Sequence, residues 1–228
     1  MPARARLYIS SIITVGFVLL AGCLLFKREF SDLPRYLTYL LLACVASTLK
    51  VKLPKIRGTM SINFVFILMG VAQLTAAETI TLGCLAALMQ SFWKPRKRPT
   101  VVQALFNIAT LVTSVAVSYA VSHALDQGRN VPVELTVAVC TFFVLNTGMV
   151  SLVLSLVEQQ PLRKVWRQCY LWSFPYYLVG AAIASAITIS GRTVGWQSSL
   201  LILPVMYMIY SYYRLYLLQL AEGDYAAT

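Results

Sequence analysis

The feature that most constrains the fold is a run of 33 residues, Ser61 to Trp93, in which Glu78 is the only formal charge. As a single α-helix, this run would be about 50 Å long at about 1.5 Å per residue. The hydrocarbon core of a bilayer is about 30 Å thick, and tilt alone does not absorb that difference. We therefore expect the chain to double back and form a short helical hairpin over 61–93.

Other apolar runs fill most of the chain. Its residues are 59% hydrophobic and only 12% charged, whereas soluble domains are about 45–50% apolar and about 25% charged. The sequence therefore predicts an all-α, polytopic integral membrane helical bundle, with seven to eight segments and eight as the best count. A single transmembrane domain covers 1–228. The expected spans are about 7–26, 36–49, 61–75, 77–93, 101–125, 135–157, 170–190 and 198–213, and the first is too long for a signal peptide.

The hairpin also decides the predicted topology. A turn near Thr75 places two basic clusters, within 50–57 and 94–98, on the same side of the membrane. With both termini inside (N-in/C-in), fourteen Lys and Arg residues face the cytoplasm and five face outward, as the positive-inside rule requires. The net charge of +11 is explained by these flanking clusters, so we expect no nucleic-acid partner.

The sequence Thr75-Ala76-Ala77-Glu78 has the T-x-x-E form of a capping box. Thr75 would cap the second helix of the hairpin, and Glu78 would sit at the hairpin tip near the outer interface. The alternative is a carboxylate that faces a cavity and binds a ligand. The two arms are short for full spans, so they are either helices in a locally thinned bilayer or a re-entrant hairpin shielded by neighbours.

Neutral polar side chains inside the spans are the other candidates for chemistry. Buried amides need partners, and they either hydrogen-bond between helices or line a pocket for a small ligand. His123, the only histidine, is expected at an interface, with pH sensing as the alternative. The predicted ligand-binding residues are Asn63, Gln73, Glu78, Asn107 and Asn146.

Catalytic and metal-binding signatures are absent from the sequence. It has no H-E-x-x-H, G-x-S-x-G or P-loop motif, and its five cysteines include no C-x-x-C pair. We therefore expect no enzyme activity, no catalytic residue, no metal site and no cofactor.

The stretch from "KLPKIRGTMSINFVF" through "RPTVVQALFNIA", about residues 50–125, resembles the N-terminal multi-span membrane sensor regions of bacterial cyclic-di-GMP signalling proteins with GGDEF or HD-GYP domains. The last span, running into "YSYYRLYLLQLAEG", is similar to the point where such regions pass into a signalling helix. The sequence has no such catalytic domain, so the resemblance implies sensing without cyclase or phosphodiesterase activity. It implies either a module that works alone or a fragment of a longer protein. A looser similarity to the substrate-capturing subunits of energy-coupling-factor transporters supports ligand binding by analogy.

Two functional hypotheses follow for a protein of the bacterial inner (cytoplasmic) membrane. The first is a non-enzymatic sensory or ligand-binding module that relays a signal through its C-terminal helix. The second is a small-molecule transporter, or the substrate-binding membrane subunit of one, with the broken 61–93 segment at its translocation site. A purely structural anchor is a third interpretation. The expected partners are the lipid bilayer, a small-molecule or lipid ligand, and a cytoplasmic signalling protein or a second copy of the chain.

Overall fold

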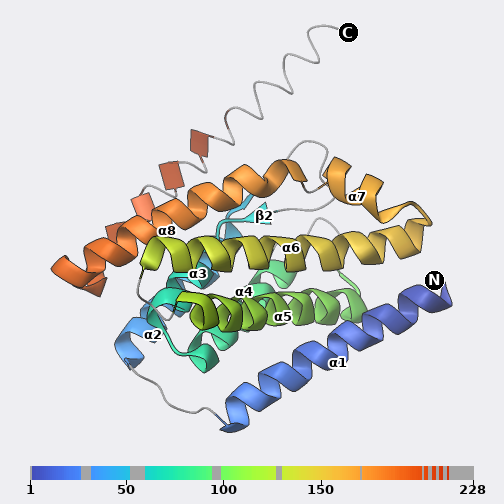
Figure 1. Cartoon of the computed structure of the whole chain (residues 1–228), viewed down its shortest axis with the longest axis horizontal. Coiled ribbons are helices and arrows are strands. Elements are labelled where there is room, and N and C mark those ends of the chain that lie inside the picture. The colour runs from blue at the N-terminus through green and yellow to red at the C-terminus, as the bar shows by residue number, and fades with distance from the viewer. Residues whose placement is uncertain are drawn as a thin grey trace, which may run out of the picture.

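Eight α-helices make up most of the chain that the computed structural model describes, which is residues 2–26, 32–51, 60–93, 99–126, 130–169 and 171–201, with 203–204, 207–208, 211–212 and 215. They form an elongated bundle (Figure 1). The helices are α1 (Ala3–Phe26), α2 (Leu33–Thr48), α3 (Phe64–Gln73), α4 (Ala76–Phe92), α5 (Val101–Asp126), α6 (Val131–Glu158), α7 (Leu162–Cys169) and α8 (Phe174–Val194), with the short 3-10 turns η1 (Leu171–Ser173) and η2 (Trp196–Leu201).

Four of these helices are long and apolar enough to cross a membrane, which makes the chain an integral membrane protein. They are Ala3–Leu25 within α1, Val101–Leu125 within α5, Val131–Glu158 and Phe174–Val194. Helices α2, α3 and α4 have 16, 10 and 17 residues. The prediction of an all-α bundle with membrane-spanning helices is confirmed, although the predicted spans 36–49, 61–75 and 77–93 form shorter helices.

The 61–93 run forms two helices, α3 and α4, joined by a turn at Leu74 and Thr75. Gly70 faces Thr79 across this turn, and a Cβ atom on Gly70 would lie 3.3 Å from the Thr79 side chain. The two helices are therefore in contact beside the turn. The predicted break of this run into two helices is confirmed.

Helix α3 is enclosed on all sides. Every residue from Phe64 to Val71 is buried, and the helix packs against α2, α4, α6 and α8. A helix that is hydrophobic all round belongs in a protein interior. This burial favours the hairpin that is shielded by neighbours over an arm exposed to a thinned bilayer.

Small residues allow the close helix contacts that hold the bundle together. A Cβ atom at Gly16 of α1 would come within 2.6 Å of Ala109 in α5. A Cβ atom at Gly180 of α8 would collide with the ring of Phe64 in α3. Both glycines therefore permit a backbone approach that no other residue allows, as is common between membrane helices.

Polar contacts between helices show which elements meet at each end of the bundle. Near the hairpin tip, the hydroxyls of Tyr36 in α2 and Thr81 in α4 are 3.0 Å apart. At the far end of α2, Ser47 accepts a hydrogen bond from Asn63, which precedes α3. The hairpin tip therefore lies at the end where α2 begins, together with the end of α5 and the start of α6.

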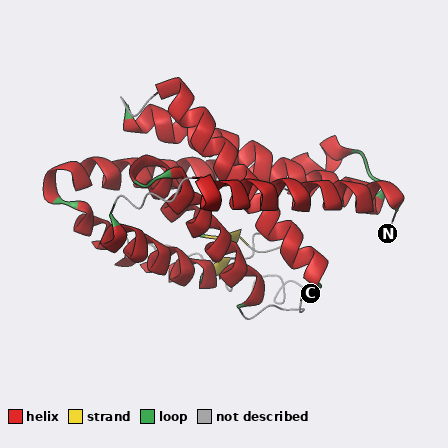
Figure 2. Cartoon of the chain, turned by 90° about the horizontal axis from the view of Figure 1, so that it is seen from below, coloured by secondary structure: helices red, strands yellow, loops and turns green. Residues whose placement is uncertain are grey.

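Two features depart from the predicted architecture, and one predicted span lies largely outside the described residues. An antiparallel pair of two-residue strands, β1 (Lys50–Val51) and β2 (Met60–Ser61), lies between α2 and α3; it is drawn in yellow in Figure 2. Helix α7 forms where the sequence suggested only a loop. The predicted 198–213 span begins within η2, and much of it falls outside the described residues.

Candidate functional site

The tip of the α3–α4 hairpin is built around a capping box. The Thr75 hydroxyl accepts a hydrogen bond from the backbone N–H of Glu78 at 3.3 Å. One carboxylate oxygen, Glu78 Oε2, accepts bonds from the Thr75 N–H at 2.8 Å and from the Thr75 hydroxyl at 3.0 Å. The predicted capping box is confirmed. Glu78 is 0% exposed, so its carboxylate is held inside the bundle by the first turn of α4, where the helix dipole favours a negative charge.

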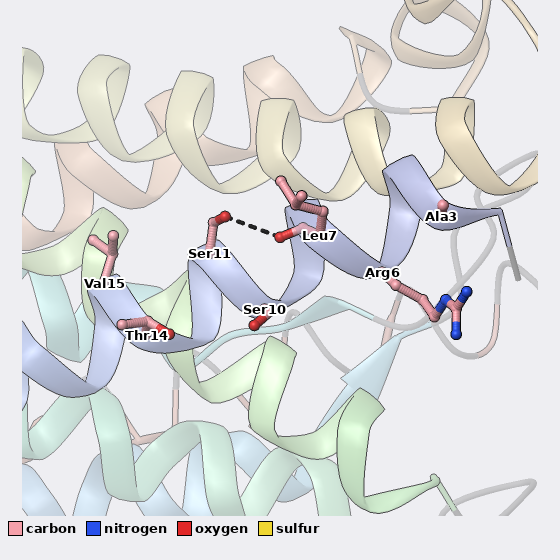
Figure 3. A pocket seen from close by; sticks show the side chains of 7 residues that line it. All are labelled: Ala3, Arg6, Leu7, Ser10, Ser11, Thr14 and Val15. Atoms are coloured by element: carbon pink, nitrogen blue, oxygen red, sulfur yellow. Dashed lines mark hydrogen bonds between the residues drawn. The ribbon is translucent and has the colours of Figure 1, made fainter.

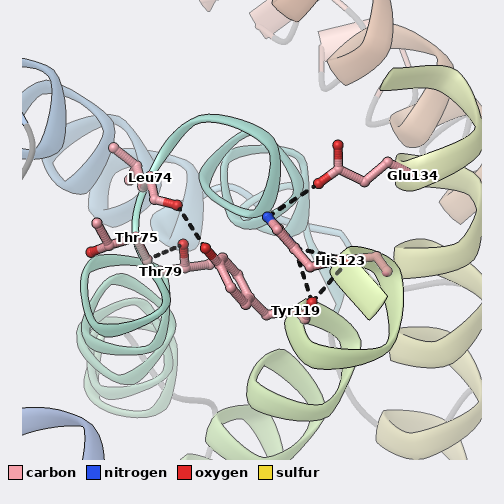
Figure 4. A network of polar contacts seen from close by, with 7 residues as sticks. Leu74, Thr75, Thr79, Tyr119, His123 and Glu134 are labelled. Atoms are coloured by element: carbon pink, nitrogen blue, oxygen red, sulfur yellow. Dashed lines mark hydrogen bonds and ion pairs between the residues drawn. The ribbon is translucent and has the colours of Figure 1, made fainter. Parts of the chain in front are cut away.

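Tyr119 connects the hairpin tip to α5. Its hydroxyl donates a hydrogen bond to the Leu74 carbonyl oxygen at 3.3 Å (Figure 4). That carbonyl lies at the C-terminal end of α3, where backbone acceptors lack partners within the helix. The Tyr119 hydroxyl is also close enough to interact electrostatically with both Glu78 and Glu134.

His123, one turn further along α5, connects this tyrosine to α6. Its ring stacks on that of Tyr119, with centroids 4.0 Å apart and an angle of 14° between planes. Nδ1 lies 3.0 Å from the Tyr119 carbonyl oxygen, and Nε2 lies 3.4 Å from Glu134 Oε1. The His123 side chain is 36% exposed, whereas that of Glu134 is 3% exposed.

Both ring nitrogens of His123 thus face oxygen acceptors. A backbone carbonyl can only accept, so Nδ1 must carry a hydrogen. The 3.4 Å approach of Nε2 to Glu134 Oε1 is a charge contact and not a hydrogen bond. A protonated His123 would make this contact an ion pair, and a neutral imidazole would not.

Gln73 lies near this cluster and bridges three helices. Its side-chain oxygen accepts a hydrogen bond from Tyr39 of α2 at 2.9 Å. Its side-chain nitrogen donates to Thr188 of α8 at 3.0 Å. The amide therefore ties the end of α3 to α2 and α8, which is the helix-bridging role considered for these residues.

The other predicted amides lie elsewhere. Asn63 is at the opposite end of α3, about 15 Å along the axis from Gln73 at 1.5 Å per residue, and it is bonded to Ser47 and Ser61. Asn146 of α6 hydrogen-bonds to Tyr177 of α8. Asn107 is exposed on the outer side of α5. The five predicted residues therefore do not converge on one pocket, and only Gln73 and Glu78 lie near the hairpin tip.

Tyr119 and Glu134 were not predicted as site residues. The sequence placed Glu134 in the loop before a span beginning at 135, whereas α6 begins at Val131 and buries Glu134 in its first turn. Pro132 in the first turn is the signal that favours the earlier start. Tyr119 resembled the many other aromatic residues of the spans, so nothing in the pattern distinguished it.

A separate shallow, open surface region of about 740 Å³ lies along α1. Figure 3 shows its lining, which comes from this one helix and includes Arg6, Ser10, Ser11 and Thr14. None of the polar tip residues lines it. In the described chain, no three His, Cys, Asp or Glu side chains come together as a metal site.

These features define a helical integral membrane protein with a partly buried polar cluster where the α3–α4 turn meets the α5–α6 junction. We call the cluster of Thr75, Glu78, Tyr119, His123 and Glu134 the tip cluster. No protein-family model, curated protein or solved structure matches the chain.

Proposed function

We propose that the protein is a non-enzymatic sensory module of a bacterial inner membrane, and that its tip cluster responds to protons at the periplasmic end of the bundle. The observation that carries this proposal is the placement of both His123 nitrogens opposite oxygen acceptors. Ionisable residues buried within membrane bundles are costly and are commonly functional. The cluster is the one place in the described chain where a histidine meets a buried carboxylate.

The charge distribution supports the orientation. Of the described basic side chains, Arg4 and Arg6 begin α1 and three more lie on α7, whereas Arg35 and Arg192 lie at the other end of the bundle. The Tyr8 hydroxyl donates to the Met149 carbonyl oxygen at 3.3 Å, which sets the start of α1 beside the second half of α6. Both basic groups therefore lie at the end opposite the tip cluster (Figure 1). By the positive-inside rule, that end faces the cytoplasm.

This orientation has a direct test. Single cysteines introduced at Thr59 and Thr100, beside the two basic clusters, should react with a membrane-impermeant thiol reagent only in inside-out vesicles. A control cysteine at Asn130, beside the tip cluster, should react only in right-side-out vesicles. Opposite accessibility at positions 59 and 100 would contradict the proposed orientation.

The proton would act by holding α5 to α6. When His123 is protonated, its imidazolium and the Glu134 carboxylate form an ion pair at 3.4 Å between the ends of α5 and α6. When His123 is neutral, the ion pair is lost and the charge of Glu134, which also acts on Tyr119, is left uncompensated. Because this contact joins the end of α5 to the start of α6, gaining or losing the ion pair would change how the two helices meet.

A route for the signal runs through Gln73. Loosening the tip would shift the end of α3, and Gln73 there is bonded to Thr188 near the end of α8. Helix α8 packs in turn against η2, which leads to the C-terminal segment. A cytoplasmic signalling partner or a second copy of the chain would read that segment, provided that the two protonation states favour different packings.

The proposal is tested with a fluorophore on a single cysteine, Ala226→Cys, in a variant whose native cysteines are replaced by alanine. In nanodiscs titrated from pH 5 to pH 8, the signal should show one transition. Glu134→Gln should abolish it, because the neutral amide leaves no ion pair with His123 to form or break. Glu158→Gln, at the other end of the same helix, is the matched control and should retain it. A transition that persists in Glu134→Gln would overturn the proposal.

A small transporter is the second candidate, favoured by the interrupted α3–α4 segment. Broken helices that point an N-terminus at a binding site are typical of secondary transporters, and the N-terminus of α4 points into the tip cluster. Proteoliposomes with an internal pH dye would separate the two functions. Proton flux that depends on this chain supports transport, whereas a pH response without flux supports sensing.

A further inference from the structure

Helix α7 (Leu162–Cys169) has a basic face that neither the fold nor the tip cluster uses. Arg163, Lys164 and Arg167 are all exposed. At 100° per residue they fall within one arc of about 100°, while Val165 and Trp166 point the other way. None of the three basic side chains forms an ion pair with a carboxylate of the described chain.

The opposite face fixes α7 to the bundle. Val165 is 5% exposed. The Trp166 indole N–H donates to the Thr147 hydroxyl at 2.9 Å, and its ring packs 6.4 Å from that of Phe143, centroid to centroid. Because this face is anchored to α6, the basic face is held outward in a defined orientation.

The position of α7 places this face at the edge of the membrane. Helix α6 has 28 residues and is about 42 Å long, which exceeds the hydrocarbon core of about 30 Å. Gln159 then adopts a left-handed conformation, with φ of 53°, and ends the helix. The chain folds back so that α7 contacts the C-terminal half of α6 (Figure 1).

From this geometry we propose that the basic face of α7 binds the phosphate headgroups of anionic phospholipids. A guanidinium group matches a phosphate with two parallel hydrogen bonds, and basic residues at a bilayer surface attract anionic lipids. Arg163 and Arg167 are one turn apart on the same side, so they can share one headgroup, with Lys164 beside them. The site does not depend on the proposed response to protons.

The experiment uses the full chain purified in a neutral detergent and titrated with phosphatidylglycerol or with phosphatidylcholine of the same acyl chains. Thermal unfolding reports binding, because a ligand that binds the folded state raises the melting temperature. Phosphatidylglycerol should stabilise the wild type more than phosphatidylcholine does, and 1 M salt should reduce the difference. Equal shifts with the two lipids would overturn the proposal.

Variants locate the site. The triple variant R163Q/K164Q/R167Q should lower the apparent affinity for phosphatidylglycerol by at least about tenfold. Arg192→Gln removes an exposed basic residue at the other end of the bundle and should leave the affinity unchanged. R163K/R167K keeps the charge but loses the paired hydrogen bonds, so it should fall between wild type and the triple variant. A triple variant with wild-type affinity would place the lipid elsewhere.

If the triple variant did not fold, R163K/R167K would still decide the matter, because it preserves the charge of α7. Inorganic phosphate is titrated as a further ligand in the same thermal unfolding assay. Phosphate without a lipid should give no comparable stabilisation, since the site is proposed to act on a headgroup presented at the bilayer surface. Stabilisation by phosphate equal to that by phosphatidylglycerol would contradict a lipid site.

Discussion

Replacing Thr75 by alanine removes both hydrogen bonds of its hydroxyl at the hairpin tip. The bond accepted from the Glu78 N–H is an ordinary N-cap, whose loss costs about 1 kcal/mol. The bond donated to the Glu78 carboxylate is charge-assisted, and such bonds contribute about 1.5–3 kcal/mol. Because the carboxylate keeps the Thr75 N–H at 2.8 Å, we expect part of this second loss to be recovered. Thr75→Ala should lower the free energy of unfolding by about 2–3 kcal/mol.

The measurement is reversible unfolding in mixed micelles, followed by far-ultraviolet circular dichroism. Thr75→Ser is the matched control, because serine caps helices at least as well as threonine. Its loss of one methyl group should cost less than about 1 kcal/mol. If Thr75→Ala and Thr75→Ser were equally stable, the hydroxyl would not hold the tip, and the account of how Glu78 is kept inside the bundle would be wrong.

Two further changes test the packing and the helix bridges. Gly180→Ala should destabilise the protein by about 1–3 kcal/mol, because the new methyl group meets an aromatic ring of α3, whereas Gly148→Ala, with open space around it, should be neutral or stabilising by up to about 1 kcal/mol. Gln73→Leu should cost about 1–3 kcal/mol, because it leaves two hydroxyl partners on other helices without their amide. Asn107→Leu should change stability by less than about 0.5 kcal/mol, since this side chain is exposed. The structure would be contradicted if Gly180→Ala and Gly148→Ala changed stability equally. It would also be contradicted if Gln73→Leu and Asn107→Leu did.

The apolar runs and the hairpin could be predicted because they depend on local chemistry. A stretch of 33 residues with a single charge is too long for one span, and the T-x-x-E pattern marks where a second helix can begin. Both inferences need only the lengths of helices and bilayers and the donors of a helix N-terminus. Neither depends on how the helices pack.

The partners of individual polar residues could not be predicted, because they depend on packing. A membrane helix can be apolar on every side, so its periodicity does not reveal which face turns inward. Asn107 and Gln73 were therefore equivalent in the sequence, although the first is exposed and the second bridges three helices. The pairing of His123 with Glu134 could not be predicted for another reason, because the predicted span began at 135 and left that carboxylate in a loop.

The burial of α3 has a consequence for how the protein is made. A ten-residue helix is too short to be a stable independent span when it leaves the translocon. Helix α8 packs against α3, with Gly180 next to the Phe64 ring. It is synthesised after α4, α5 and α6. The α3–α4 hairpin can therefore be fully packed only after α8 has been inserted, so assembly of the core is a late, post-insertion step. Chains truncated before α8 should expose α3 to membrane proteases and chaperones.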